Sequence, residues 1–263
     1  MMPDGASNWP ARTTGAKAPP ALKAHEIHVW AARLDVSPAT REHLAATLSL
    51  SEQERAARFH FERHRQRFTT ARGLLRVLLG HYLERDPREL EFGYGAAGKP
   101  SLSGSASDKA LQFNLTHSED LALVAVTDAG QVGIDVERIR PMKDADEFVA
   151  RFFSEREHAS FKRLPESQKP TAFFTLWTRK EAWLKATGEG IAQSLNRVEV
   201  SFLPGEPARL LAVPDSLSQG STWDLVNLSP APGFAAALAI AASAPEVQCW
   251  WWRPHAEPGT GKD

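Results

Sequence analysis

Cysteine is nearly absent from this chain of 263 residues, in which Cys249 is the single example. One cysteine excludes an internal disulfide, a Cys-x-x-Cys pair and a zinc site built from several thiolates. Long hydrophobic runs are also missing, since none approaches the roughly 20 residues that a membrane-spanning helix needs. The N-terminus lacks the basic and apolar regions of a secretory signal. We therefore expect a cytoplasmic protein that does not interact with a membrane.

The chain has no excess of either charge. It contains 31 Lys and Arg against 32 Asp and Glu, for a net charge of −1, so no global attraction to a polyanion follows. A basic run at residues 63–67 is local, and the nearby Glu54 and Glu62 weaken a nucleic-acid interpretation. We expect no nucleic-acid partner, and any anion site must be local.

The order of hydrophobic patterns predicts an α+β protein with two halves, each containing helices and a small antiparallel sheet. Apolar alternation and helix-start signals begin after a segment rich in Ala, Pro and Gly, which predicts a disordered tail. We expect the boundary between the halves near Gly130. The predicted parts are a tail at 1–24, a first unit at 25–130, a second unit at 131–252 and a polar tail at 253–263.

Several elements follow from local patterns within these units. A helical segment is expected at 55–83 and a loop marked by glycines and Pro100 at 93–108. The apolar strand 121–126 and the strand 132–137 are separated by a turn, which predicts a hairpin. A second helix is expected at 171–187.

The strand at 132–137 carries two carboxylates on one side. Val132, Ile134 and Val136 alternate with Gly133, Asp135 and Glu137, and this period of two places Asp135 and Glu137 about 7 Å apart on the same face. The glycine predicts open space beside them. Such a pair repels unless a cation lies between the carboxylates, and hard oxygen ligands suit Mg²⁺. The alternative is an acidic face exposed to solvent.

The helix at 171–187 supplies further charged residues. Its apolar stripe of Phe173, Leu176, Trp177 and Leu184 contains Lys180 and has Glu181 at its edge. Charges on a buried side need partners. Glu181 and Lys185 also have the spacing of a simple surface ion pair. The functional alternative is a third carboxylate for the same cation, with lysines for a phosphate group.

Two nucleotide motifs are only apparent. The segment 93–100, Gly-Tyr-Gly-Ala-Ala-Gly-Lys-Pro, fits Gly-x-Gly-x-x-Gly and nearly fits a P-loop. Pro100 replaces the hydroxyl that would bind Mg²⁺, and no helix start follows. With both motifs excluded, we expect only a turn at this segment, in which Lys99 could contact a phosphate. The segment 114–118, Asn-Leu-Thr-His-Ser, lacks a nucleophile elbow and favours polar contact with a ligand.

Together these segments resemble the Sfp-type 4′-phosphopantetheinyl transferases. The resemblance is carried by Gly98-Lys99-Pro100, Phe113 to Ser118, Gly133 to Glu137, Arg151 to Ser154 and Trp177 to Lys185, in the same order and with similar spacing. It covers about residues 55 to 195. It implies a pseudo-dimer of two similar α+β subdomains with the active site in the cleft between them. It also implies transfer of phosphopantetheine from coenzyme A to a serine of an apo acyl or peptidyl carrier protein, with release of adenosine 3′,5′-bisphosphate.

The resemblance further implies roles for individual residues. Asp135, Glu137 and Glu181 would hold Mg²⁺, and Lys185 would support the leaving group in catalysis. From its place at the edge of the apolar helix face, and not from the resemblance, we expect Glu181 to be the catalytic base, accepting the serine proton directly or through a metal-bound water. The residues implied to contact coenzyme A are Arg67, Arg72, Lys99, Thr116, His117, Lys180 and Lys185. An internally duplicated chain can form its cleft as a monomer. The alternatives are a Mg²⁺-dependent hydrolase of a nucleotide diphosphate and a non-catalytic module that docks on carrier proteins.

Overall fold

The computed structural model describes residue 9 and residues 19–188, 195–214 and 222–254. Eleven strands, seven α-helices and one short 3₁₀-helix fall within these ranges. The first part contains β1 (Glu26–Arg33), α1 (Pro38–Ala45), α2 (Leu50–Ala57), α3 (Glu62–Leu83), η1 (Pro87–Glu89), β2 (Phe92–Tyr94), β3 (Pro100–Leu102), α4 (Ala106–Ala110), β4 (Gln112–Ser118) and β5 (Leu121–Thr127). The second contains β6 (Val132–Arg138), α5 (Ala145–Phe152), α6 (Glu155–Lys162), α7 (Lys169–Thr187), β7 (Glu199–Val200), β8 (Leu210–Ala212), β9 (Asp224–Leu228), β10 (Phe234–Ile240) and β11 (Glu246–Trp251).

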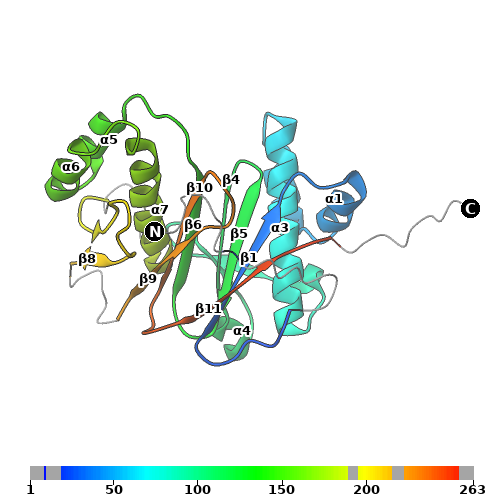
Figure 1. Ribbon diagram of the computed structural model, residues 1–263. Coiled ribbons are helices and arrows are strands. Elements are labelled where there is room, and N and C mark those ends of the chain that lie inside the picture. The colour runs from blue at the N-terminus through cyan, green and yellow to red at the C-terminus, as the bar shows by residue number, and fades with distance from the viewer. Residues whose placement is uncertain (1–8, 10–18, 189–194, 215–221, 255–263) are drawn as a thin grey trace, which may run out of the picture.

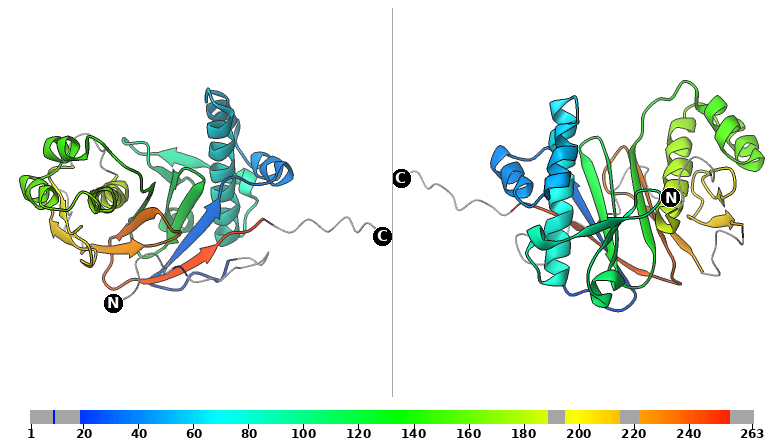
Figure 2. Two further views of the ribbon diagram at one scale, coloured as in Figure 1. Left: turned by 45° about the horizontal axis from the view of Figure 1, so that its top comes forward. Right: turned by 180° about the vertical axis from the view of Figure 1, so that it is seen from behind.

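Two sheets organise the molecule. The first has the order β11-β1-β5-β4, and the second has the order β6-β10-β9. The helix α3 covers one face of the first sheet, where Leu74 and Leu78 pack with Trp30, Val124 and Trp250. The two long helices α3 and α7 lie on opposite sides of the strands (Figures 1 and 2).

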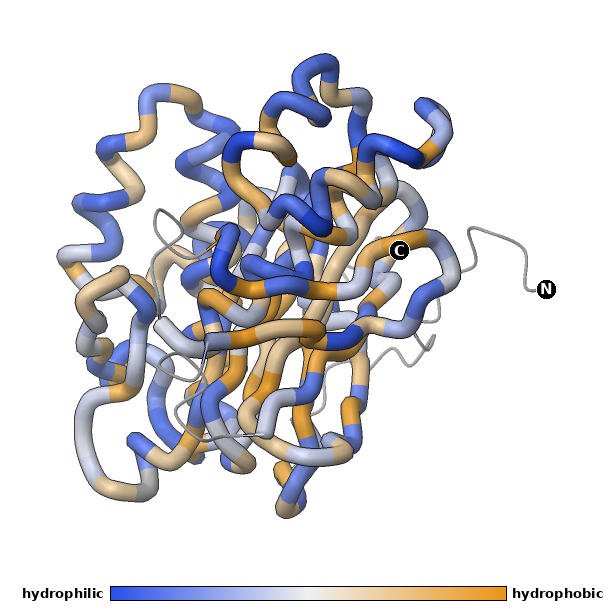
Figure 3. Tube along the Cα trace, turned by 90° about the vertical axis from the view of Figure 1, so that its left-hand side faces the viewer, coloured by the Kyte–Doolittle hydropathy of each residue, from blue (hydrophilic) through white to orange (hydrophobic). Residues whose placement is uncertain are grey.

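The helix α7 covers one face of the second sheet. Along β10, Ala235, Ala237 and Ala239 point to this side, and their small side chains leave room for the helix. The other faces of both sheets share one apolar cluster, in which Val29 and Leu123 meet Ile134 and Leu238. Burying both apolar sheet faces against each other removes them from water. In Figure 3 the hydrophobic colour accordingly runs along the central strands.

The two parts share one order of elements. Each begins with a strand, continues through a long helix and ends with two strands, β1-α3-β4-β5 and β6-α7-β9-β10. In both sheets the last of these strands lies in the middle. This repeat supports the interpretation of two similar halves. The final strand β11 returns to the first sheet and pairs in parallel with β1, so the predicted unit 131–252 contributes its last strand to the other sheet.

The structure corrects three expectations about the elements. The predicted hairpin of 121–126 and 132–137 is wrong, because β5 pairs with β1 and β4 while β6 pairs with β10. The helical segment 55–83 is divided between α2 and α3. The predicted loop 93–108 contains the paired strands β2 and β3.

Most of the predicted tails, 1–24 and 253–263, lies outside the described residues. Among the helices that the structure describes, none is long and apolar enough to cross a membrane.

Candidate active site

The site forms where α7 lies directly on β6. A Cβ atom added to Gly133 would lie 2.1 Å from the carbonyl oxygen of Ala182 and 2.3 Å from the amide nitrogen of Ala186. The space that the glycine provides is therefore filled by the helix backbone, and the interpretation of open space was wrong. This close approach brings Glu181 and Lys185 over the carboxylate side of β6.

Asp135 is the buried centre of the site. One oxygen, Oδ1, accepts a hydrogen bond of 2.5 Å from Nζ of Lys185 and one of 3.1 Å from the hydroxyl of Thr116. The other, Oδ2, is buried and has no hydrogen-bond partner in the described chain. Burial raises the pKa of Asp135 despite the neighbouring Lys185 cation.

Glu181 and Glu137 extend this acidic group. Oε1 of Glu181 is also buried without a hydrogen-bond partner among the described residues. Burial, together with the charges of Asp135 and Glu137, raises the pKa of Glu181 to about 7. Glu137 accepts a 2.7 Å hydrogen bond from Ser118, and burial followed by the charge of Asp135 raises its pKa. The negative charges of these carboxylates thus act on one another.

This arrangement has the chemistry of a cation site. Two buried carboxylate oxygens without partners are costly unless a cation or a proton satisfies them, and hard oxygen donors suit Mg²⁺. Asp135, Glu137 and Glu181 therefore fit such an ion as a donor set. No group of three or more His, Cys, Asp or Glu residues in the described chain is already arranged around one point as a metal site. Lys185 supplies the positive charge at Asp135.

A row of polar side chains on β4 joins the two sheets at this point. Asn114 accepts a 2.9 Å hydrogen bond from the amide of Ile134, Thr116 donates to Asp135, and Ser118 accepts from the amide of Arg138 at 3.1 Å. Sequence reasoning assigned this segment to ligand contact and missed the roles of Asn114 and Ser118. The available signal was their period of two, which places Asn114, Thr116 and Ser118 on one face.

Two adjoining cavities open beside the carboxylates. The smaller, of about 310 Å³, is lined by Lys99, Asn114, Glu181 and Lys185 among others. The larger, of about 800 Å³, has a basic lining and shares Gly98, Pro100 and Leu115 with the smaller one. Its charged and aromatic lining comprises Glu52, Glu54, Arg55, Arg58, Phe68, Arg72, Tyr94 and His117, so three arginines outnumber two carboxylates. The two cavities thus adjoin, with Glu181 and Lys185 lining one and the three arginines lining the other.

Lys99 and Arg67 are both held by the protein. Nζ of Lys99 donates to the carbonyl oxygens of Val132 and Ala186, at 2.9 Å each, and burial lowers its pKa to about 8. It therefore ties the turn between β2 and β3 to β6 and α7. Arg67 forms 3.2 Å ion pairs with Asp35 and Glu119.

The implied phosphate contact of Lys180 is contradicted by its position. Its side chain is fully buried, and Nζ pairs with Glu157 at 2.6 Å and donates to the carbonyl oxygens of Leu195 and Val198. Lys180 therefore holds α7 against α6 and the segment before β7, and has no path to a bound phosphate. The helical pattern identified a buried lysine but not the side on which its partners lie.

Comparison with known proteins identifies the family of this chain. The model of the 4′-phosphopantetheinyl transferase superfamily matches residues 131–239, and a model of the N-terminal part of 4′-phosphopantetheinyl transferases matches residues 35–129. The 4′-phosphopantetheinyl transferase HetI of Nostoc sp. is 43% identical over 87% of this chain and 93% of its own length. The 4′-phosphopantetheinyl transferase AcpT of Salmonella typhimurium is 38% identical over 60% of this chain and 74% of its own.

Among solved structures, the holo-[acyl-carrier-protein] synthase of Helicobacter pylori in complex with coenzyme A is similar to part of the chain. The match has a TM-score of 0.34 and 22% identity and covers 42% of this chain and 99% of the other. The level of identity to HetI, over nearly the full length of both proteins, decides the assignment. The chain is an enzyme of the 4′-phosphopantetheinyl transferase superfamily.

Proposed function

We propose that this enzyme transfers 4′-phosphopantetheine from coenzyme A to a serine of an apo acyl or peptidyl carrier protein and releases adenosine 3′,5′-bisphosphate. The observation that carries the proposal is the pair of unsatisfied buried oxygens on Asp135 and Glu181, next to Lys185 at the wall of a cavity. The adjoining basic cavity suits the nucleotide end of the coenzyme. The family assignment supplies the reaction class.

Mg²⁺ belongs to this proposal, with Asp135, Glu137 and Glu181 as its protein ligands. When bound, the ion would offset the negative charge of the pyrophosphate and of the transition state. The donor chemistry and the raised pKa values of the three carboxylates support this role. The hydroxyl of Thr116 donates a hydrogen bond to Asp135, so we propose that Thr116 orients Asp135 as a metal ligand.

The protein's own groups account for the proton and the leaving group. The serine oxygen forms a bond to the β-phosphorus of coenzyme A as the phosphorus–oxygen bond to the nucleotide breaks. Glu181, at the wall of the smaller cavity, accepts the serine proton directly or through a water. Lys185 lines the same cavity and would stabilise the charge on the leaving phosphate.

The other residues of the two cavities would position the substrate. Arg72 and His117 line the larger cavity and are placed to meet the nucleotide end. Lys99 lines the smaller cavity beside the proposed pyrophosphate position. Arg67 would exchange its ion pairs with Asp35 and Glu119 for a contact with a phosphate. Because one chain builds the whole site, we also propose that the enzyme is a monomer. We further propose that it works in the cytoplasm.

Incubation with coenzyme A, Mg²⁺ and an apo carrier protein tests the function. The proposal predicts that intact-mass spectrometry shows the carrier gaining one phosphopantetheine on its serine. Hydrolysis of coenzyme A without any gain on the carrier would instead support a nucleotide-diphosphate hydrolase. Binding of the carrier with neither reaction would support a docking module.

The role of Glu181 as the base has a test of its own. Glu181→Gln keeps the size of the side chain and removes its proton acceptor. Full turnover by this variant, with coenzyme A and Mg²⁺ bound normally, would show that the base lies elsewhere.

A further inference from the structure

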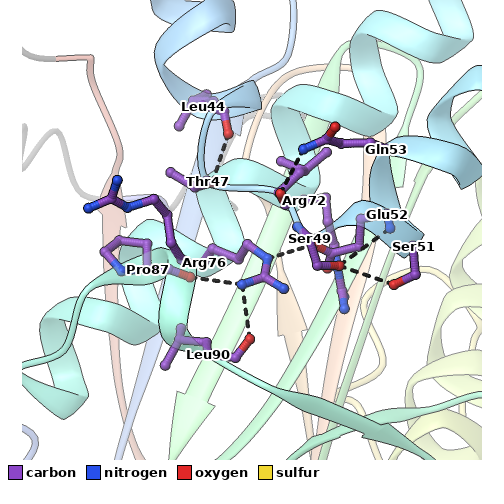
Figure 4. A network of polar contacts seen from close by, with 12 residues as sticks. Leu44, Thr47, Ser49, Ser51, Glu52, Gln53, Arg72, Arg76, Pro87 and Leu90 are labelled. Carbon is purple, nitrogen blue, oxygen red and sulfur yellow. Dashed lines mark hydrogen bonds and ion pairs between the residues drawn. The ribbon is translucent and has the colours of Figure 1, made fainter.

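One ion-pair network stands apart from the carboxylate site and carries an unbalanced charge. Glu52 on α2 lies between Arg72 and Arg76 of α3, with Oε1 paired to Nε of Arg72 and Oε2 at 2.6 Å from Nε of Arg76 (Figure 4). The three residues are 3%, 7% and 2% exposed. Two guanidinium groups share one carboxylate, so a net positive charge is buried here, and a buried charge requires compensation.

The two arginines differ in what they do with their remaining donors. Nη1 of Arg76 donates to the carbonyl oxygens of Pro87 and Leu90, at 2.8 and 3.0 Å, as Figure 4 shows. Arg76, Pro87 and Leu90 are not among the residues that line the larger cavity in the described chain. Arg76 is therefore occupied as a structural link between α3 and the segment before β2.

Arg72 lines the larger cavity, and one of its guanidinium donors has no protein acceptor among the described residues. Its Nε binds Glu52 and its Nη2 donates to the hydroxyl of Tyr94 at 2.9 Å. The ring of Phe92 lies 4.4 Å from Cζ. Within the described residues Nη1 donates to no protein atom, and Arg72 lines the 800 Å³ cavity. The excess charge of the network is thus presented to the cavity through one fixed guanidinium.

We propose that Glu52 is a positioning residue for substrate binding. Its carboxylate accepts a hydrogen bond from Nε of Arg72 and so orients the guanidinium plane. In this orientation Nη1 is free to bind a phosphate group on the nucleotide end of coenzyme A. The phosphate in turn neutralises the positive charge that the network leaves unbalanced. Arg76 supplies rigidity only. This inference rests on the proposed function, because that function supplies the phosphate ligand.

The test compares Glu52→Gln, Arg72→Met and the double variant, with Arg76→Met as the matched control from the same network. The dissociation constant of coenzyme A is measured by titration calorimetry. Glu52→Gln and Arg72→Met should each weaken binding about tenfold, the value of one hydrogen bond to a charged group. The double variant should be no weaker than Arg72→Met. Arg76→Met should lower the melting temperature and leave the affinity for coenzyme A unchanged.

A structural role alone predicts a different pattern. Unchanged affinity in Glu52→Gln, an equal loss in Arg76→Met, or additive losses in the double variant would each overturn the inference. Turnover adds a second readout: the KM for coenzyme A should rise in Glu52→Gln while kcat stays within about twofold, since Asp135 and Glu181 are untouched.

A second variant keeps the test usable if Glu52→Gln fails to fold. Tyr94 is 54% exposed, so Tyr94→Phe should fold normally while it removes the other anchor of the Arg72 guanidinium. It should weaken coenzyme A binding about threefold, and no change would contradict the inference. If the wild-type protein binds no coenzyme A, both the proposed function and the inference fall. If the wild-type protein binds it and Glu52→Gln binds it equally well, only the inference falls.

Discussion

At the scale of residues, neighbouring positions on one helix have unrelated tasks. Lys180 pairs with Glu157 inside the second half, whereas Lys185 pairs with Asp135 at the site. The helical pattern predicted that Lys180, Glu181 and Lys185 were unusual positions for charge. It did not predict the partner of Lys180, because Glu157 comes from a different helix and only the packing of α6 on α7 brings it near.

This difference predicts opposite outcomes for two similar substitutions. Lys180→Met leaves Glu157 buried without a cation and should reduce the free energy of unfolding by about 3–5 kcal/mol. Lys185→Met removes a half-buried cation at the cavity wall and should reduce transfer at least about 100-fold, with a smaller loss of stability. Urea unfolding and the carrier assay measure both. Wild-type stability in Lys180→Met, or wild-type turnover in Lys185→Met, would contradict these assignments.

The raised pKa of Glu181 predicts how stability varies with pH. Between the ordinary glutamate value of 4.5 and about 7, the folded chain holds a proton that the unfolded chain has lost. Stability should therefore fall as pH rises through this range, by up to about 3 kcal/mol in the absence of divalent cations. Glu181→Gln should remove this part of the slope and be more stable than wild type at pH 8.

Thermal unfolding in EDTA across pH 4.5–8 measures the slope. Glu147→Gln, a change at an exposed glutamate of α5, is the control and should keep the wild-type profile. An identical profile for Glu181→Gln and wild type would mean that Glu181 does not titrate as described.

At the scale of elements, the sequence pattern predicted β6 and α7 individually but not how closely α7 packs on β6. Period-two alternation predicted the strand, and an apolar stripe predicted the helix. The close approach depends on Gly133 together with the alanines of β10, a combination that appears only when the two strands are paired. This approach sets the distance between Asp135 and the charged groups of the helix.

Gly133→Ala tests the approach directly. The new methyl group would meet backbone atoms of Ala182 and Ala186, which no side-chain rotation relieves. The helix must move away from β6, so we expect a loss of about 1–3 kcal/mol of stability and a large loss of transfer. Gly93→Ala is the control, because its methyl group would meet nothing closer than the Ser103 hydroxyl at 3.5 Å. Equal behaviour of the two variants in unfolding and transfer would count against the close approach.

At the scale of the whole molecule, local patterns identified strands but not their partners. The hairpin expected from 121–126 and 132–137 does not form, because both edges of β5 are already paired. The return of β11 to the first sheet also had no local signal. The α+β class and the acidic strand of the second half followed from the sequence, because both depend on periodicity within single segments.

The site itself is a product of this global arrangement. Residues from β4 reach residues of β6 through side chains, and α7 supplies the remaining groups. We propose that this junction of the two sheets performs the transfer. Asp135 lies at its centre, since it is bonded to Lys185 and Thr116 and its charge acts on Glu181.

The most direct test is the single-turnover rate of phosphopantetheine transfer to an apo carrier by Asp135→Ala. Its melting temperature is measured alongside that of wild type to confirm that the variant is folded. We expect wild type to convert the carrier and the folded variant to be slower by at least about 10²–10³-fold. A folded Asp135→Ala protein that transfers at the wild-type rate would show that the transfer does not take place at this junction.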